Sequence, residues 1–257
     1  MSFSNPKAKN PATKFIEFKG ESGNFQYYDK EKEDNVIIPI PIYFVVLDEL
    51  HTVRGYNKNH KAGVFSNEVR NIKEELLSVR VFNSDIKIVG LWDQIKGDVT
   101  RIQGHYSKSV YAGLITKGNP MELVNFQFHG ASRAPWFDCK IDKEQFGITV
   151  KEVETDDSGS IKFKRPVFSK LNLRDDIIKE AKELDRKLQE YLKTYLRQKE
   201  EEIVEAGIDE PPENDVIYTD VEVEEQNTYS DEEIYTKMHE PKKKDIPNQN
   251  DYNDLPF

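Results

Sequence analysis

The sequence predicts a mainly β body, followed by a long helix and an acidic tail. Short runs rich in Val, Ile, Tyr and Phe, separated by Gly, Asn, Asp and Pro, extend from residue 14 to about residue 168, as in a β-sandwich or small barrel. Apolar residues then recur every three or four positions between residues 172 and 206, which is the period of a helix. Beyond residue 207 the chain is rich in Glu, Asp, Asn and Ser, so we expect disorder there.

Length and composition restrict the class of protein. The chain has 257 residues, of which 37% are hydrophobic and 11% aromatic, so we expect one medium domain with appendages, or two small domains. The single Cys139 excludes an internal disulfide framework and fits a reducing compartment. No apolar run approaches the roughly 18 residues of a membrane span, and the N-terminus lacks the apolar segment of a signal peptide. We therefore expect a soluble cytoplasmic protein.

The first two segments are a flexible arm over residues 1–12, which is mildly basic, and the β body over residues 13–171. Within the body, residues 36–47 contain Pro39 and Pro41, which remove amide donors and favour a sheet edge or an irregular rim. Strands are also predicted over residues 86–92 and 99–102, and a short helix over residues 66–75. Trp136 is expected in a loop.

The long helix is predicted over residues 172–207. Asn172 can cap its start, Asp175 and Asp176 suit the positive end of the helix dipole, and Gly207 suits its end. We expect this helix to pack on the β body. Pairing with a second copy of the chain, which would produce a homo-oligomer, is the alternative.

Charge is distributed unevenly along the chain. Residues 200–257 contain 4 Lys or Arg and 19 Asp or Glu, whereas residues 1–199 contain 33 and 28, so a body of net charge +5 precedes a segment of −15. This asymmetry is expected of a protein that binds a polyanion and screens its own binding site with the acidic tail over residues 208–257. The alternative is an acidic tail that only keeps the protein soluble.

No sequence motif predicts catalysis. The five histidines do not have the spacing of metal ligands, and there is no HExxH, Walker, GxGxxG or GxSxG motif. Asp48, Glu49 and His51 suggest a nuclease-like metal cluster, but adjacent carboxylates in a strand point to opposite faces. We therefore expect that the protein is not an enzyme and needs no cofactor or metal.

Two stretches combine the residue types that single-stranded nucleic acid requires, namely cations for the phosphates and rings on which bases stack. One is residues 54–61 and the other is residues 101–111. If the second stretch is a strand, Tyr106 and Lys108 share one face and Tyr111 lies on the other, so one tyrosine stacks on bases and the other enters the core. Both tryptophans are further candidates for either role. The predicted DNA-binding residues are Arg54, Tyr56, Lys58, Lys61, Trp92, Arg101, Tyr106, Lys108, Tyr111, Arg133 and Trp136.

The sequence ends in Asp254, Leu255, Pro256 and Phe257. A carboxylate beside an aromatic ring is a feature that a pocket with a basic rim captures. This ending resembles the C-terminal tip of the single-stranded DNA-binding proteins (SSBs) of bacteria and phages, which is rich in Asp and ends in Ile-Pro-Phe. The resemblance covers about four to seven residues, and here the acidic residues of the tip are scattered.

The resemblance implies a body that is an OB-like β-barrel. It also implies sequence-independent binding and protection of single-stranded DNA during phage or bacterial replication, recombination and repair, in the host cytoplasm if the protein is phage-encoded. Asp254, Leu255, Pro256 and Phe257 would dock on replication or recombination proteins. The body is longer than that of a typical bacterial SSB and the linker is rich in Glu, so tetramer formation and DNA wrapping do not carry over. The alternatives are a recombination or annealing protein, a nuclease, and a scaffold that docks through the tail without binding DNA.

Overall fold

The computed structural model describes residues 9–139, 147–157 and 162–205. The chain divides into two units, residues 1–208 and 209–257, and the described residues all belong to the first. The predicted acidic tail and the predicted docking residues 254–257 therefore lie outside the described residues, as do residues 1–8 of the predicted arm.

The described residues form strands, three α-helices and one 3-10 helix. The elements in chain order are β1 (Lys14–Lys19), β2 (Asn24–Asp29), β3 (Asp34–Ile38), β4 (Ile42–Asn57), β5 (Ala62–Ser66), β6 (Leu77–Val81), β7 (Lys87–Gly90), α1 (Trp92–Arg101), β8 (Gly104–Ile115), β9 (Glu122–Phe128), η1 (Gly130–Ser132), α2 (Arg133–Asp138), β10 (Gly147–Asp156), β11 (Phe163–Leu171) and α3 (Asp175–Glu205). The prediction of a mainly β fold with a long helix after the strands is confirmed.

The strands pair into one sheet in the order β3-β2-β1-β9-β8-β4-β5-β6-β7, and β10 pairs with both β4 and β11. The β1–β9 pair is parallel, and the other pairs are antiparallel. Among the described residues the order has two ends, so these pairings do not close the sheet. One end is β3, which confirms the predicted edge for residues 36–38, whereas residues 42–47 of the same predicted segment belong to the central strand β4. Pro39 and Pro41 lie between β3 and β4.

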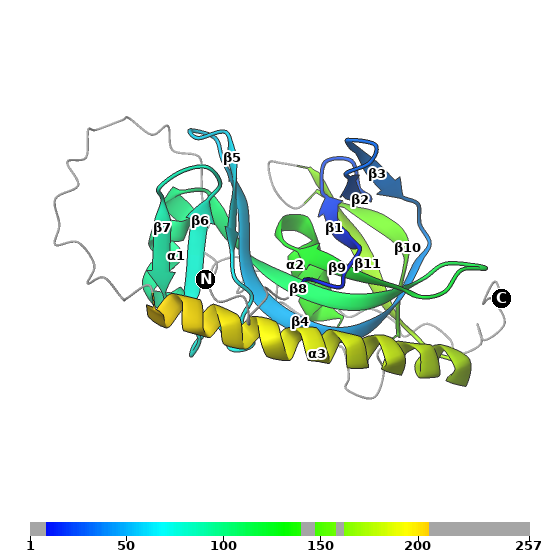
Figure 1. The fold of residues 1–257 in the computed structure, drawn as a ribbon. Helices are drawn as coiled ribbons and strands as arrows, with labels where there is room; N and C mark the ends of the chain where they lie inside the picture. Colours follow the sequence, from blue (N-terminus) through cyan, green and yellow to red (C-terminus); the bar gives the residue numbers. More distant parts are fainter. Residues whose placement is uncertain (1–8, 140–146, 158–161, 206–257) are drawn as a thin grey trace. The chain divides into compact units, whose positions relative to one another are not determined.

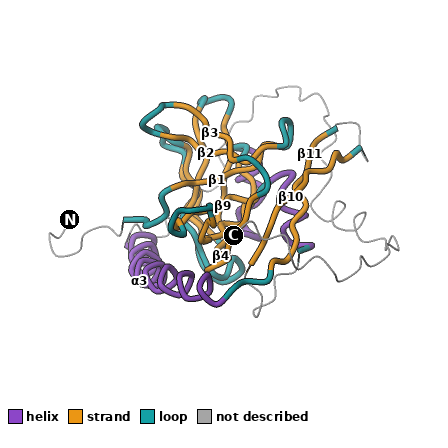
Figure 2. Tube along the Cα trace, turned by 90° about the vertical axis from the view of Figure 1, so that its right-hand side faces the viewer, coloured by secondary structure: helices purple, strands orange, loops and turns teal. Residues whose placement is uncertain are grey.

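The long strands β4 and β8 form the centre of the sheet and pair from Tyr43–Ile115 to Gly55–Gly104. One core cluster is built on β1, β2, β4, β8, β9 and β10 together with Trp136 of α2. A second is formed by β4, β5, β6 and α1. Helix α3 packs along β4 and β8 (Figure 1), and Figure 2 shows it almost end-on, outside the curled sheet. Its buried residues Ala181, Leu188 and Leu192 confirm that the helix packs on the body.

Three local predictions are wrong. Residues 66–75 are not a helix: Ser66 ends β5, and the residues after it form turns, irregular backbone and a single bridge from Val69 to His51. Residues 99–102 are not a strand, because residues through Arg101 belong to α1, where Ile95 and Val99 lie one turn apart and are both buried. Trp136 lies in α2 rather than in a loop. In α1, tertiary burial of one helix face overrides the β propensity of a short apolar run.

Candidate nucleic-acid interface

The β4–β8 pair separates the predicted binding residues onto two faces. Val53 lies opposite Tyr106, and His51 lies opposite Lys108, whereas Asp48 lies opposite Tyr111. Directly opposed residues of an antiparallel pair share a face. We call the face of Tyr106 and Lys108 the inner face, which α1 and α2 adjoin, and the face of Tyr111 the outer face, on which α3 packs. The predicted placement of the two tyrosines on opposite faces is confirmed.

Three aromatic rings and a cation meet on the inner face, and we call Trp92, Tyr106, Arg133 and Phe137 the stacking cluster. The ring centroids of Trp92 and Tyr106 are 5.9 Å apart, and those of Tyr106 and Phe137 are 6.5 Å apart with an angle of 18° between the rings. The guanidinium carbon of Arg133 lies 6.0 Å from the Tyr106 centroid. Phe137 is 49% exposed, so the cluster presents an aromatic surface to solvent.

The elements that carry the stacking cluster are far apart in sequence. Trp92 begins α1, Tyr106 lies in β8, and α2 presents Arg133 and Phe137 one helical turn apart. Residues four apart on a helix lie on the same side. The sequence therefore predicted three of the four members. Phe137 was missed because α2 is a single short helix in a segment predicted as a loop.

A network of polar side chains contacts the Tyr106 hydroxyl. The Tyr106 hydroxyl lies 2.7 Å from Nδ1 of His51, and Nε2 of His51 lies 3.5 Å from Nζ of Lys108. Burial, with a smaller contribution from the charge of Lys108, lowers the pKa of His51 to about 4, so this histidine is neutral at pH 7. Because an ammonium group only donates, Nε2 accepts from Lys108, and the Nδ1–H donates to the Tyr106 oxygen.

Three of the predicted DNA-binding residues are buried. Lys108 is only 8% exposed and its ammonium lies 3.5 Å from the Glu49 carboxylate, so it is part of the polar network. Trp136 is 3% exposed and donates its indole N–H to Glu49 at 2.8 Å. Tyr111 is fully buried. In this conformation neither of these two rings offers a face to a base.

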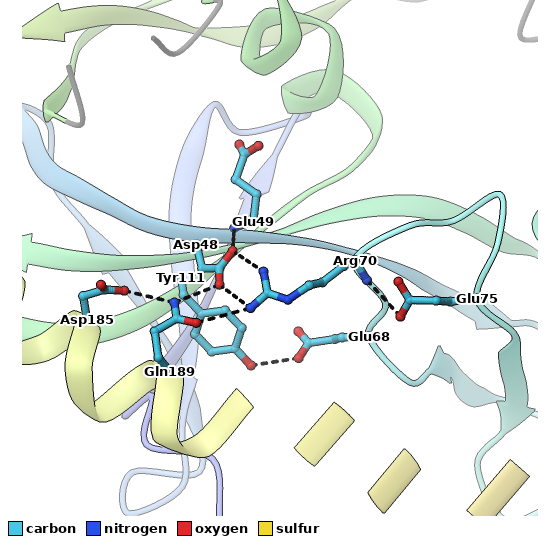
Figure 3. Close-up of polar contacts among 8 residues, drawn as sticks. All are labelled: Asp48, Glu49, Glu68, Arg70, Glu75, Tyr111, Asp185 and Gln189. Atoms are coloured by element: carbon cyan, nitrogen blue, oxygen red, sulfur yellow. Dashed lines mark hydrogen bonds and ion pairs between the residues drawn. The ribbon is translucent and has the colours of Figure 1, made fainter. Parts of the chain in front are cut away.

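Tyr111 is buried because α3 and a buried carboxyl group cover it on the outer face (Figure 3). Its hydroxyl donates to Oε2 of Glu68 at 2.8 Å and accepts from Nδ2 of Asn10 at 2.9 Å. Burial raises the pKa of the Glu68 carboxyl. The amide N–H of Glu68 donates to the hydroxyl of Tyr195 in α3 at 3.0 Å, so this network links the sheet to the helix.

Asp48 and Glu49 point to opposite faces, as the sequence predicted for adjacent carboxylates in a strand (Figure 3). Asp48 accepts two hydrogen bonds from the guanidinium of Arg70, at 3.1 and 2.9 Å, and one from Nε2 of Gln189 in α3 at 3.0 Å. Glu49 instead belongs to the inner-face network. Asp48 therefore helps to fasten α3 to the sheet. In the described ranges, no group of three or more His, Cys, Asp or Glu side chains is placed to hold a metal ion.

The remaining predicted residues lie away from the stacking cluster. Arg54 and Tyr56 are on the outer face of β4, and Lys58 and Lys61 belong to the exposed hairpin turn between β4 and β5. Arg101 lies in the last turn of α1 and pairs with Asp98. The structure therefore brings Trp92, Tyr106 and Arg133 together and places Arg54 and Tyr56 on the opposite face of the sheet.

Comparison with known proteins adds no relative: no protein-family model matches the chain, and no curated protein or solved structure shows significant similarity to it. Within the described ranges, none of the helices has both the length and the apolar character that crossing a membrane demands. The fold and the site therefore define a mainly β protein with a long helix and a cluster of three rings, one of them exposed, beside a cation.

Proposed function

We propose that this protein binds single-stranded DNA without regard to sequence, on an OB-like body, and protects it during replication, recombination or repair. The stacking cluster is the observation that supports this proposal. It holds three rings and a guanidinium at one place, and the Phe137 ring is half exposed. Every base has a π-face, so stacking tolerates any sequence, and a nearby cation interacts with the adjoining phosphate.

The charge distribution supports the same function. A body of net charge +5 attracts a polyanion, and a segment of −15 competes with that polyanion for the body. DNA binding would then release the acidic segment. Residues 254–257, by their resemblance to the SSB tip, would dock on replication or recombination proteins in the cytoplasm.

The first prediction concerns the ligand itself. Fluorescence anisotropy of labelled oligo-dT should show tight binding, and a duplex of the same length should bind more weakly because its bases are not free to stack. The logarithm of the affinity should fall linearly with the logarithm of the salt concentration, with a slope of about −0.7 for each phosphate contacted. Equal affinity for duplex would contradict the role of stacking, and absence of binding would favour the scaffold alternative.

The second prediction concerns the acidic segment. A chain that ends at Ala206 should bind oligo-dT more tightly than the full chain at low salt, and the difference should shrink as salt rises because screening weakens the competing attraction. A full-length variant with the Asp and Glu residues of 209–257 changed to Asn and Gln is the matched control and should behave like the shortened chain. Identical affinities of the full and shortened chains at low salt would refute the screening role.

A further inference from the structure

A second surface of cations and rings lies on the outer face, and the strand register defines it. Arg54 lies opposite His105 of β8 on one side and Phe65 of β5 on the other. Phe65 lies opposite Arg80 of β6, which lies opposite Lys87 of β7. Because directly opposed residues share a face, these five side chains form one row across five strands, which we call the cationic row. His105, Arg80 and Lys87 are exposed, so α3 leaves this part of the outer face open.

Next to the cationic row, two exposed rings flank a glycine. Tyr56 lies opposite Gly63, and the amide of Phe82 donates to the Gly63 carbonyl at 2.9 Å. Phe82 is the first residue of the turn after β6, and its side chain is exposed whereas that of its neighbour Val81 is buried. Tyr56 is 57% exposed and Phe82 is 58% exposed. A Cβ atom at Gly63 would meet no heavy atom within 4 Å, so the space above this glycine is open. We call this place the Gly63 slot.

The composition of this surface matches a single strand of nucleic acid. The cationic row contains no acidic side chain, and the turn that carries Lys58 and Lys61 adjoins the Gly63 slot. Cations in a line can follow successive phosphates, while exposed rings beside them accept unpaired bases. A duplex does not offer its bases to such rings, so the residues favour a single strand.

A segment of β8 that β9 leaves unpaired lies between the two surfaces. Strand β9 pairs with β8 from Lys108 to Leu114, so among the described residues the segment 104–107 of β8 has no strand on that side. Here Tyr106 belongs to the stacking cluster and its neighbour His105 begins the cationic row. Adjacent residues of a strand point to opposite faces. A bound chain that leaves the stacking cluster therefore meets His105 as soon as it passes around this edge.

We propose that one continuous single strand runs from the stacking cluster, around the edge of β8 at residues 104–107, along the cationic row and into the Gly63 slot. The inference rests on the proposed function and extends it. It assigns Phe65, Arg80, Phe82, Lys87 and His105 to the binding path. It also requires that short oligonucleotides occupy only the stacking cluster and that longer ones reach both surfaces.

The test measures affinity against oligonucleotide length. Oligo-dT from about 4 to about 30 nucleotides, a range that spans the site sizes of single OB-folds, is titrated with the full chain and with the double variant Arg80→Ala, Lys87→Ala. We expect unchanged affinity for the shortest oligonucleotides and weaker binding of the long ones. For long oligonucleotides the salt slope should become shallower by about 1.4, because two phosphate contacts are lost. Lys182→Ala with Lys187→Ala, two exposed residues of α3, is the control with the same charge change and should leave both quantities unchanged.

Gly63→Val tests the slot without removing a charge. The added side chain meets open space, so the fold should keep its unfolding midpoint in urea, while long oligo-dT should bind about 5- to 150-fold more weakly because one stacked base is displaced. If long oligonucleotides bind the Arg80→Ala, Lys87→Ala variant and the Gly63→Val variant as tightly as they bind the unchanged protein, the continuous path is overturned, while the proposed function stands. Two short oligonucleotides bound by each unchanged chain would also overturn the continuous path, since the surfaces would then hold separate strands. Absence of single-strand binding by the unchanged protein would remove the proposed function itself.

Discussion

Replacing Phe137 with Ala should weaken the binding of single-stranded DNA about 5- to 150-fold, since a stacked base contributes roughly 1–3 kcal/mol. The ring is 49% exposed and stands at the surface of the stacking cluster. Its removal therefore lowers the stability of the fold little, but it removes the ring on which a base stacks. Anisotropy titration of oligo-dT measures the affinity, and urea unfolding shows whether the variant keeps its stability.

Phe15 provides a matched control for Phe137. It is 44% exposed and lies in β1, so Phe15→Ala removes the same ring from a comparable surface position outside the cluster. This variant should bind as the unchanged protein does, and Phe137→Tyr should keep most of the affinity because it keeps a ring. Equal losses in the two alanine variants, or no loss in Phe137→Ala, would contradict the assignment of the stacking cluster.

Replacing Trp136 with Ala should lower the free energy of unfolding by about 3–5 kcal/mol, the range for truncating a buried Trp or Phe. The indole is 3% exposed. Its centroid lies 4.4 Å from that of Phe128 and 5.2 Å from that of Phe168, so truncation leaves a cavity between aromatic rings. Urea denaturation followed by far-UV circular dichroism gives the change, and a loss below about 1 kcal/mol would contradict the packing.

Two further variants separate packing from hydrogen bonding at this position. Trp136→Phe keeps most of the ring but removes the N–H that donates to Glu49, so the loss of stability should be smaller than in the alanine variant. Trp92→Ala removes the other tryptophan, which is only half-buried, and should also destabilise the fold less. A larger loss of stability in Trp92→Ala than in Trp136→Ala would contradict the assignment of Trp136 as the buried core tryptophan.

The sequence identified most of the stacking cluster, because its signals are local. Alternation along a strand placed Tyr106 and Tyr111 on opposite faces, and the mixture of rings and cations singled out Trp92 and Arg133. Phe137 gave no such signal, because α2 is too short to show a helical period. Of the cationic row, only Arg54 was among the residues predicted from the sequence. Its members come from five strands, and neighbours in the row are joined only by cross-strand pairing.

By itself the sequence determined the features that depend on neighbours along the chain. These are the mainly β character of the body, the apolar stripe that became α3, the sheet edge that Pro39 and Pro41 favour, and the contrast between a basic body and an acidic tail. Only the tertiary structure decided which of the predicted rings are exposed, because exposure depends on what other segments contribute. Helix α3 and Glu68 bury Tyr111. Trp136 of α2 packs in the aromatic core, whereas Phe137, its neighbour in α2, stays at the surface. Pairings between distant strands set these outcomes, and no local period encodes them.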